Sequence, residues 1–477
     1  MKKLLLLVSI LALGLTLSAC KPGTDEPDPD PVCTNRASEG TLYEFDKNQT
    51  TITEIKVWLD DEAYATALIA AFEAEYPDIK VEWEEVGAVD TRQGLETYSG
   101  SEFAADVVVF PHDHIGAALN SNLLYPFPDS QRSDLETRMV SSAISTATSC
   151  YDSANNTAVE CDGTFASELF GAPVSGESVA LFYNKTLLND IDSTKTYPEA
   201  TWEEIIASAL AYNMIDDPLT TEVNEARSYF RLDVGNAYDM HFTATAFGFE
   251  LFGADHLDKT SANLGSTEMI DALTWLNGTL RPALNNYGSS TLDGESNRQA
   301  FEEGELPYII DGPWSIQRYT EAAIDNNDTP DDTSDDSVNF EWGVAKIPTI
   351  GGVQPVTFSG VQIAAVYKGT SQPTAAFKFV EFMTSEEGLA IMYAETGKLP
   401  ALKDVSVVEG VAADEYLSGI SAQLSYSHPM PIIPEMGYFW SNAGSMYSSA
   451  WNGTASPEAA AATAQAGFDS QAGITTD

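Results

Sequence analysis

The stretch IKVWLDDEAYATALIAAFEAEYPDIKVEWEEV, residues 55–86, indicates the fold class. Ile55 to Leu59 is a short apolar run typical of a buried strand, and apolar residues at helical spacing follow it. Pro77 ends that predicted helix, and Lys80 to Val86 is the next predicted strand. Ala105 to Phe110 is a third apolar run. This alternation of strands and helices predicts an α/β fold with a mostly parallel sheet covered by helices on both faces.

The length of the chain, 477 residues, exceeds what a single hydrophobic core usually organises, so we expect two or more lobes. Apolar residues make up 43% of the chain and aromatic residues 10%, which is enough to fill sizeable cores. The formal net charge is −49. Phosphate binding requires clustered Lys and Arg, so this charge excludes nucleic acid as a partner.

The first twenty residues indicate where the protein resides. Lys2 and Lys3 precede the apolar run Leu4 to Leu17, which is too short to span a bilayer comfortably and is typical of a signal peptide. Leu17-Ser18-Ala19-Cys20 resembles a bacterial lipobox. We therefore expect residues 1–19 to be removed and Cys20 to carry lipid, which would hold the protein on the extracellular face of the cell membrane.

Residues 20–40 are expected to form a tether between the lipid and the folded body. Lys21 to Pro31 carries four prolines and four acidic residues, a composition that favours an extended, solvated chain.

The remaining cysteines are Cys33, Cys150 and Cys161. In an oxidising compartment we expect Cys150 and Cys161 to form a disulfide that closes a short loop; two free thiols are the alternative. Cys33 has no obvious partner.

The tract Asp325 to Ser337, DNNDTPDDTSDDS, is predicted to be an acidic surface loop. Six aspartates could supply oxygen ligands to Ca²⁺, but their spacing fits no EF-hand loop, and a solvated loop without a metal is the alternative that we favour.

No catalytic or cofactor-binding motif occurs in the sequence: it has no nucleophile elbow, no P-loop and no dinucleotide fingerprint. We therefore expect neither an enzyme nor a cofactor. His112-Asp113-His114 is the only histidine cluster, and it lacks an evident third ligand for a metal.

Aromatic residues instead stand at predicted strand ends and in loops: Trp58, Tyr64, Phe110, Tyr238, Trp314 and Trp440. Flat rings stack on the C–H faces of sugars, and carboxylates accept hydrogen bonds from sugar hydroxyls. Any one of these rings is more often part of a core than of a binding site. Their positions in the chain decide between the two interpretations.

Four blocks of sequence resemble the maltose/maltodextrin-binding proteins, within the broad family of extracellular solute-binding proteins. The blocks are Phe110-Pro111-His112-Asp113-His114, Pro173-Val174-Ser175-Gly176-Glu177, Asp311-Gly312-Pro313-Trp314, and Met430 to Met436 followed by Phe439-Trp440. Their order and spacing carry the resemblance, which extends from about Ile55 to the C-terminus. It assigns ligand-binding roles to Asp60, Asp61, Phe110, Asp113, His114, Glu177, Tyr238, Trp314, Met430 and Trp440.

Several positions depart from the family pattern. Phe110 replaces a tryptophan, and His114 replaces an arginine, which removes a bidentate donor. Asp60-Asp61-Glu62 replaces an Asp-Lys pair and supplies no lysine, and Ser441 replaces an aromatic residue. Another α-glucan or a different oligosaccharide therefore remains an open alternative.

The resemblance implies a type II periplasmic-binding-protein-like fold, in which two lobes, each with a mostly parallel sheet, are joined by crossing segments. Residues 41–175 plus 348–402 would form the N-terminal lobe, and residues 178–345 plus 411–477 the C-terminal lobe. The ligand would bind in the cleft, with closure by hinge bending.

The resemblance implies a monomeric receptor that passes an oligosaccharide, with a malto-oligosaccharide favoured, to the permease subunits of an ABC importer. A lipid-anchored glycan hydrolase that uses two carboxylates such as Glu177 and Asp113 is one alternative. A surface adhesin or chemosensory receptor without a transporter is another.

Overall fold

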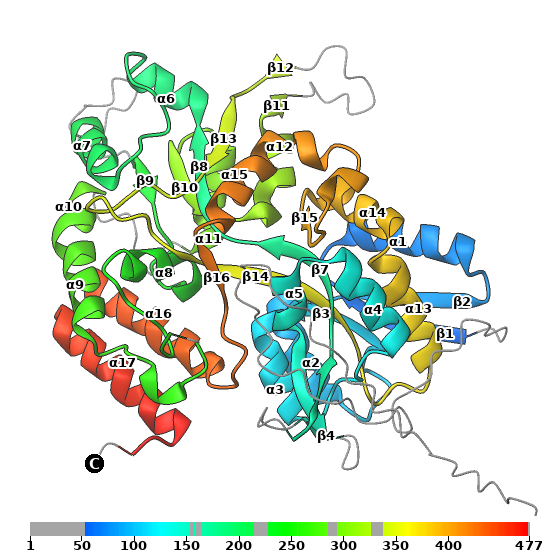
Figure 1. Ribbon diagram of the computed structural model, residues 1–477. Helices are drawn as coiled ribbons and strands as arrows, with labels where there is room; N and C mark the ends of the chain where they lie inside the picture. Colours follow the sequence, from blue (N-terminus) through cyan, green and yellow to red (C-terminus); the bar gives the residue numbers. More distant parts are fainter. Residues whose placement is uncertain are drawn as a thin grey trace, which may run out of the picture.

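The computed structural model describes residues 53–152, 157–158, 164–213, 228–254, 256–284, 293–325 and 337–475. These residues form two α/β lobes, each with its own sheet and covering helices (Figure 1). We call the half that contains β1 (Thr53–Leu59) the first lobe and the half that contains β8 (Ala180–Asn184) the second lobe. The strands β7 (Ala172–Glu177) and β14 (Thr357–Val366) lie where the chain passes between them (Figure 1).

The sheet of the first lobe has the strand order β15-β7-β14-β3-β1-β2, with β16 paired to β14. β1 pairs in parallel with β2 and with β3, as residues 55–86 and the third apolar run predict. β14 runs antiparallel to both β3 and β7. The remaining strands are β2 (Ile79–Glu85), β3 (Val107–Pro111), β15 (Leu399–Pro400) and β16 (Ser427–Pro429).

The sheet of the second lobe has the order β13-β8-β10-β9, and only β9 and β10 are parallel. The prediction of a mostly parallel sheet is therefore wrong for this lobe, and in the first sheet three described strand pairings are parallel and three antiparallel. The chain enters the lobe along β8 and leaves it along β13 towards β14, so these neighbouring strands must run in opposite directions. The strands are β9 (Phe230–Arg231), β10 (Tyr308–Asp311) and β13 (Trp342–Ala345).

Among the described residues, two short helices and five longer ones cover the first sheet. They are α1 (Glu62–Glu75), α2 (Ala88–Tyr98), α3 (Ile115–Asn120), α4 (Asp129–Arg138), α5 (Ser141–Thr146), α13 (Pro373–Met383) and α14 (Glu386–Thr396), with the 3₁₀ turn η1 (His112–His114) after β3. A small sheet of β4 (Thr148–Asp152), β5 (Thr157–Ala158) and β6 (Ala166–Leu169) lies beside them.

The second lobe is richer in helix, and segments far apart in the sequence meet in it. The last two helices, α16 (Met436–Asn452) and α17 (Pro457–Ala472), pack beside α8 (Ala237–Thr245) and α9 (Thr267–Trp275) (Figure 1). The other elements described between β8 and α16 are α6 (Lys185–Ile191), α7 (Trp202–Asn213), η2 (Lys259–Ser261), η3 (Leu276–Leu280), α10 (Arg281–Ala283), α11 (Gly294–Glu302), η4 (Pro313–Ser315), α12 (Ile316–Ala322), β11 (Ile324–Asp325), β12 (Ser337–Val338), η5 (Val405–Val407), η6 (Val411–Ala413) and α15 (Glu415–Leu424).

The buried apolar side chains form two clusters, as expected for a chain of this length. One centres on the first sheet, with Phe72, Phe110 and Ile363; the other centres on the second lobe, with Trp202 and Phe439. The first cluster continues through further residues of the second sheet and α15, namely Phe182, Ile309, Trp342 and Leu417. Because this cluster extends over both sheets, it does not define where one lobe ends and the other begins. The predicted lobe boundaries at 175, 178, 345, 348, 402 and 411 stay predictions.

Several expectations fall outside the described residues: the signal peptide, Cys20, the tether, Cys33, Cys161 and the interior of the acidic tract. Cys150, the predicted disulfide partner of Cys161, is disulfide-bonded. Within the described part of the chain, no helix has the length and apolar character required to cross a membrane.

Candidate functional site

A cavity of about 580 Å³ lies between the two lobes and is lined by residues of both. The first lobe contributes Asp60, which follows β1, and Asp113 of η1, which follows β3. The second lobe contributes Tyr238 of α8 and Trp314 of η4, which follows β10. Ligand sites of α/β proteins often lie outside the carboxyl ends of strands, where polar loop residues converge.

The structure brings eight of the ten residues to which the resemblance assigned ligand-binding roles into this cavity. They are Asp60, Asp113, His114, Glu177, Tyr238, Trp314, Met430 and Trp440. Their contact with a ligand stays a prediction, which the geometry below supports.

Phe110 does not line the cavity, so the prediction that its ring stacks on the ligand is wrong. Its side chain is fully buried in the core of the first lobe. Successive side chains of a strand point to opposite faces. In β3 it is the next residue, Pro111, that lines the cavity.

Asp61 does not line the cavity either. Its Oδ1 accepts a hydrogen bond from the backbone N–H of Tyr64 at 2.8 Å and caps the N-terminus of α1. The Asp61 carboxylate is used as a helix cap. Of Asp60 and Asp61, only Asp60 lines the cavity.

Glu177, at the end of β7, is a nearly buried carboxyl group, with a relative exposure of 6%. Burial raises its pKa to about 7, while Lys398 and a hydrogen bond from Gln362 Nε2 to Oε1 at 3.1 Å act to lower it. The carboxylates of Asp60 and Asp113 contribute to the rise. Glu177 is thus near its midpoint of ionisation at neutral pH.

Gly360 makes room for the Glu177 side chain. The two residues are direct partners in the ladder between β14 and β7. A Cβ at Gly360 would lie 2.6 Å from Glu177 Oε1 and 2.7 Å from its Cγ, so a larger residue would displace the carboxyl group.

Asp113 links the two lobes across the cavity. Its Oδ2 accepts a hydrogen bond from Nε1 of Trp440 at 3.0 Å, which fixes the orientation of the indole on α16.

His112, the residue before Asp113, has a buried ring that bridges two other segments of the chain. Val361 N donates to His112 Nδ1 at 3.0 Å, and His112 Nε2 donates to Met430 O at 3.0 Å. Burial lowers the pKa of His112, in agreement with the neutral ring that these bonds require.

Three aromatic side chains form one wall of the cavity. The ring of Tyr238 lies 6.3 Å from the rings of Trp314 and Trp440, at angles of 53° and 55°. Trp314 folds back over Gly312, where a Cβ would come within 2.3 Å of the indole. The indole of Trp314 can take this position only because residue 312 is a glycine, which has no side chain to clash with it.

Polar atoms without a partner gather around the same cavity. Tyr238 OH, His114 Nδ1 and Gln362 Oε1 are buried and make no hydrogen bond to any described residue. Buried polar groups are normally paired, because an unpaired one costs about 1–3 kcal/mol. All three atoms belong to residues that line the cavity.

Sequence reasoning missed Lys398, Gln362 and Asp239, which also line the cavity. Lys398 and Gln362 arrive through the pairing of β15 and β14 with β7. Asp239 is one helix position after Tyr238, and burial raises its pKa well above the usual range. No local sequence motif marks Lys398 or Gln362, because strand pairing brings them to the cavity. Asp239 could have been identified from the sequence, since it directly follows Tyr238.

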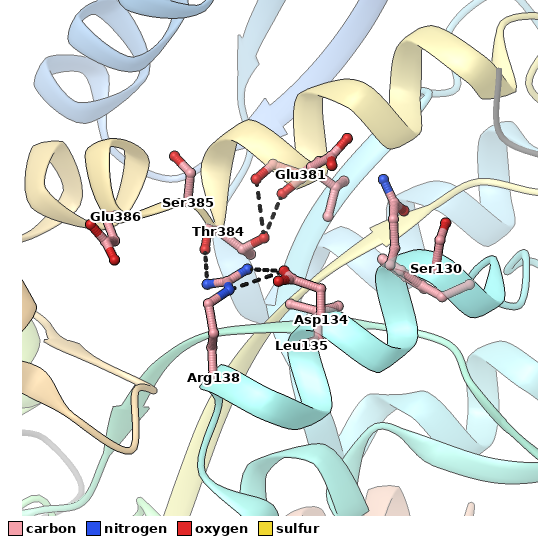
Figure 2. A pocket seen from close by; sticks show the side chains of 11 residues that line it. Ser130, Asp134, Leu135, Arg138, Glu381, Thr384, Ser385 and Glu386 are labelled. Atoms are coloured by element: carbon pink, nitrogen blue, oxygen red, sulfur yellow. Dashed lines mark hydrogen bonds and ion pairs between the residues drawn. The ribbon is translucent and has the colours of Figure 1, made fainter. Parts of the chain in front are cut away.

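A second cavity, of about 360 Å³, lies within the first lobe between α4 and the α13–α14 pair (Figure 2). The one basic side chain among its described lining residues is engaged: Arg138 Nε donates to Asp134 Oδ2 at 3.0 Å, and Arg138 Nη1 donates to the backbone oxygen of Thr384 at 2.8 Å. No aromatic wall comparable to that of the interlobe cavity lines it, and it is not our candidate site.

No group of three or more His, Cys, Asp or Glu side chains converges as metal ligands in the part of the chain that the structure describes.

Comparison with known proteins agrees with this geometry. A family model described as bacterial extracellular solute-binding protein matches residues 57–390. The "Maltooligosaccharide ABC transporter solute-binding lipoprotein" of Streptococcus pneumoniae R6 is 25% identical over 87% of this chain and 88% of its own. The "Galactooligosaccharide-binding protein" of Bacillus subtilis is 24% identical over 96% and 94%. Among solved structures, the Thermus thermophilus maltotriose binding protein bound with maltotriose has a TM-score of 0.70 at 23% identity, over 88% of this chain and all of that one.

Proposed function

Because the chain belongs to the family of bacterial extracellular solute-binding proteins, we propose that it captures a malto-oligosaccharide in the interlobe cavity for an ABC importer. Family membership confirms the resemblance noted in the sequence and makes the protein a binding protein rather than an enzyme, which removes the hydrolase alternative. One observation carries the proposal. Indole rings and nearly buried carboxyl groups line a single cavity between two lobes.

The proposed ligand follows from the chemistry of the lining and from the relatives. Trp314 and Trp440 would stack on the apolar faces of glucose rings, while Asp113 and Glu177 would accept hydrogen bonds from hydroxyls. The S. pneumoniae relative named for malto-oligosaccharides supports an α-glucan. The B. subtilis relative named for galacto-oligosaccharides makes a β-galactoside the competing ligand.

Calorimetric titration tests this proposal on the chain that lacks only residues 1–20. We expect maltotriose to bind, and Trp314→Ala to weaken binding by about 2 kcal/mol, roughly thirtyfold, through loss of the stacking surface. Tyr438→Ala is the matched control, because Tyr438 is a half-exposed aromatic of α16 that does not line the cavity. Binding of galacto-oligosaccharides without binding of any α-glucan would overturn the choice of ligand but not the site.

We also propose that lipid on Cys20 anchors the protein to the outer face of the cell membrane. Leu17-Ser18-Ala19-Cys20 and the name of the S. pneumoniae relative, a lipoprotein, support this. Metabolic labelling with an alkyne fatty acid should label the wild-type protein in the membrane fraction. Cys20→Ser should abolish the label, whereas Cys33→Ser should leave it unchanged; a label that survives Cys20→Ser would contradict the anchor.

A further inference from the structure

Strand pairing brings a lysine from late in the chain to the side of Glu177. Helix α14 ends at Thr396, and Gly397 adopts a left-handed conformation (φ 66°) that turns the chain into β15. β15 pairs antiparallel with β7, with Leu399 opposite Gly176 and Pro400 opposite Ser175. The same register places Lys398 opposite Glu177, a cross-strand pair of opposite charge.

The ammonium group of Lys398 also faces the first strand. Its Nζ lies 3.5 Å from Oδ2 of Asp60, and the side chain retains a relative exposure of only 16%. Lys398 is the only Lys or Arg side chain among the described residues that line the cavity. The carboxyl groups of Asp60, Asp113, Glu177 and Asp239 line the same cavity.

We propose that Lys398 is a ligand-binding residue, which holds Asp60 and Glu177 in place and donates a hydrogen bond to a sugar hydroxyl between them. An ammonium group has three N–H donors, and the long contact to Asp60 leaves donor capacity directed at the cavity. A sugar hydroxyl both donates and accepts, so carboxylates alone satisfy only half of its hydrogen bonds. This inference rests on the proposed function and extends it, since it assigns a cation that the sequence blocks do not contain.

The electrostatics of Glu177 support this role. The lysine lowers the pKa of Glu177, while burial, Asp60 and Asp113 raise it. Tyr238 on α8 interacts electrostatically with Glu177, and the titratable groups Asp239 and His114 line the same cavity. Without the cation, Glu177 would hold its proton to higher pH and accept fewer hydrogen bonds at neutral pH.

Two measurements test the proposal on Lys398→Met, Lys398→Gln and Lys398→Arg, with Lys80→Met as control. Lys80 pairs with Glu73 on the exposed side of β2 and does not line the cavity. In calorimetric titration with maltotriose, the Met and Gln variants should lose about tenfold or more in affinity, as expected for a hydrogen bond to a charged group. Arg should retain part of the affinity, and Lys80→Met should bind like the wild type.

The second measurement needs no ligand: the melting temperature from pH 4 to 9. The ionisation of Glu177 should lower the melting temperature as the pH rises. The pH at the midpoint of that fall should be higher in Lys398→Met than in the wild type, and unchanged in Lys80→Met. Wild-type affinity together with an unchanged midpoint in both the Met and Gln variants overturns the proposal. If the wild type binds no malto-oligosaccharide, the proposed function fails. A shifted midpoint then still supports the electrostatic interaction between Lys398 and Glu177, and an unchanged midpoint overturns that interaction.

Discussion

At the scale of single residues, the cavity combines groups whose burial is costly unless a ligand engages them. Glu177 is nearly buried beside Asp60 and Asp113, and Tyr238 OH makes no hydrogen bond to the described residues. Titratable groups with a raised pKa that gather in one cavity are typical of a functional site.

The raised pKa of Glu177 predicts a measurable pH dependence of stability in the absence of ligand. Since the pKa rises from 4.5 to about 7 on folding, the protonated form favours the folded state. Its contribution is fully present below pH 4.5 and is lost as the pH rises through about 7.

Glu177→Gln should therefore gain stability relative to the wild type between pH 5 and 8, by on the order of 3 kcal/mol. Denaturant unfolding at each pH measures the difference. Glu85→Gln, a change at an exposed carboxyl at the end of β2, is the control and should show no such gain. A constant difference between Glu177→Gln and the wild type across this range would show that Glu177 ionises normally.

At the scale of secondary-structure elements, the site depends on the register of β7 between β14 and β15. Glu177 faces Gly360 on one side and the position of Lys398 on the other. A one-residue slip of either partner would direct these side chains to the opposite face.

Gly360→Ala tests that register. The added Cβ would clash with Oε1 and Cγ of Glu177, so the carboxyl group should be displaced and maltotriose affinity should fall by about tenfold, with about 1–3 kcal/mol of destabilisation. Gly176→Ala, on the adjacent strand, is the matched control because a Cβ there meets nothing within 4 Å. Equal affinities of the two variants would refute the packing argument.

The sequence predicted elements whose signals are local. Thr201 and Glu204 carry such a local signal, a capping box, in which Glu204 N donates to Thr201 Oγ1 at 3.2 Å and Thr201 N donates to Glu204 Oε2 at 3.2 Å. Pro457 begins the last long helix, at a position where proline is tolerated. Trp314 and Trp440 could be placed at the site because the sequence blocks that contain them resemble a known family.

What the sequence could not reveal depends on contacts between distant segments. The inward direction of Phe110 depends on how β3 packs against β14, and the approach of Lys398 depends on a strand pair more than 200 residues apart in the chain. The antiparallel pairing of β8 with β13 likewise follows from the path of the chain between the lobes rather than from local composition.

At the scale of the whole molecule, two lobes share one ligand cavity, and only short segments join them. Between β7 and β8 the chain has just Ser178 and Val179. Ser178 Oγ lies 2.7 Å from Thr357 Oγ1 and donates to Phe358 O at 2.9 Å, so this crossing is tied to β14. We expect closure of the lobes around the ligand to occur by bending at these crossing segments.

A crystal structure of the protein grown with saturating maltotriose tests the central claim most directly. We predict the sugar in the interlobe cavity, stacked on Trp314 and Trp440, with hydroxyls bonded to Asp113, Glu177 and Lys398. An empty interlobe cavity, or maltotriose bound elsewhere on the protein, would contradict the account.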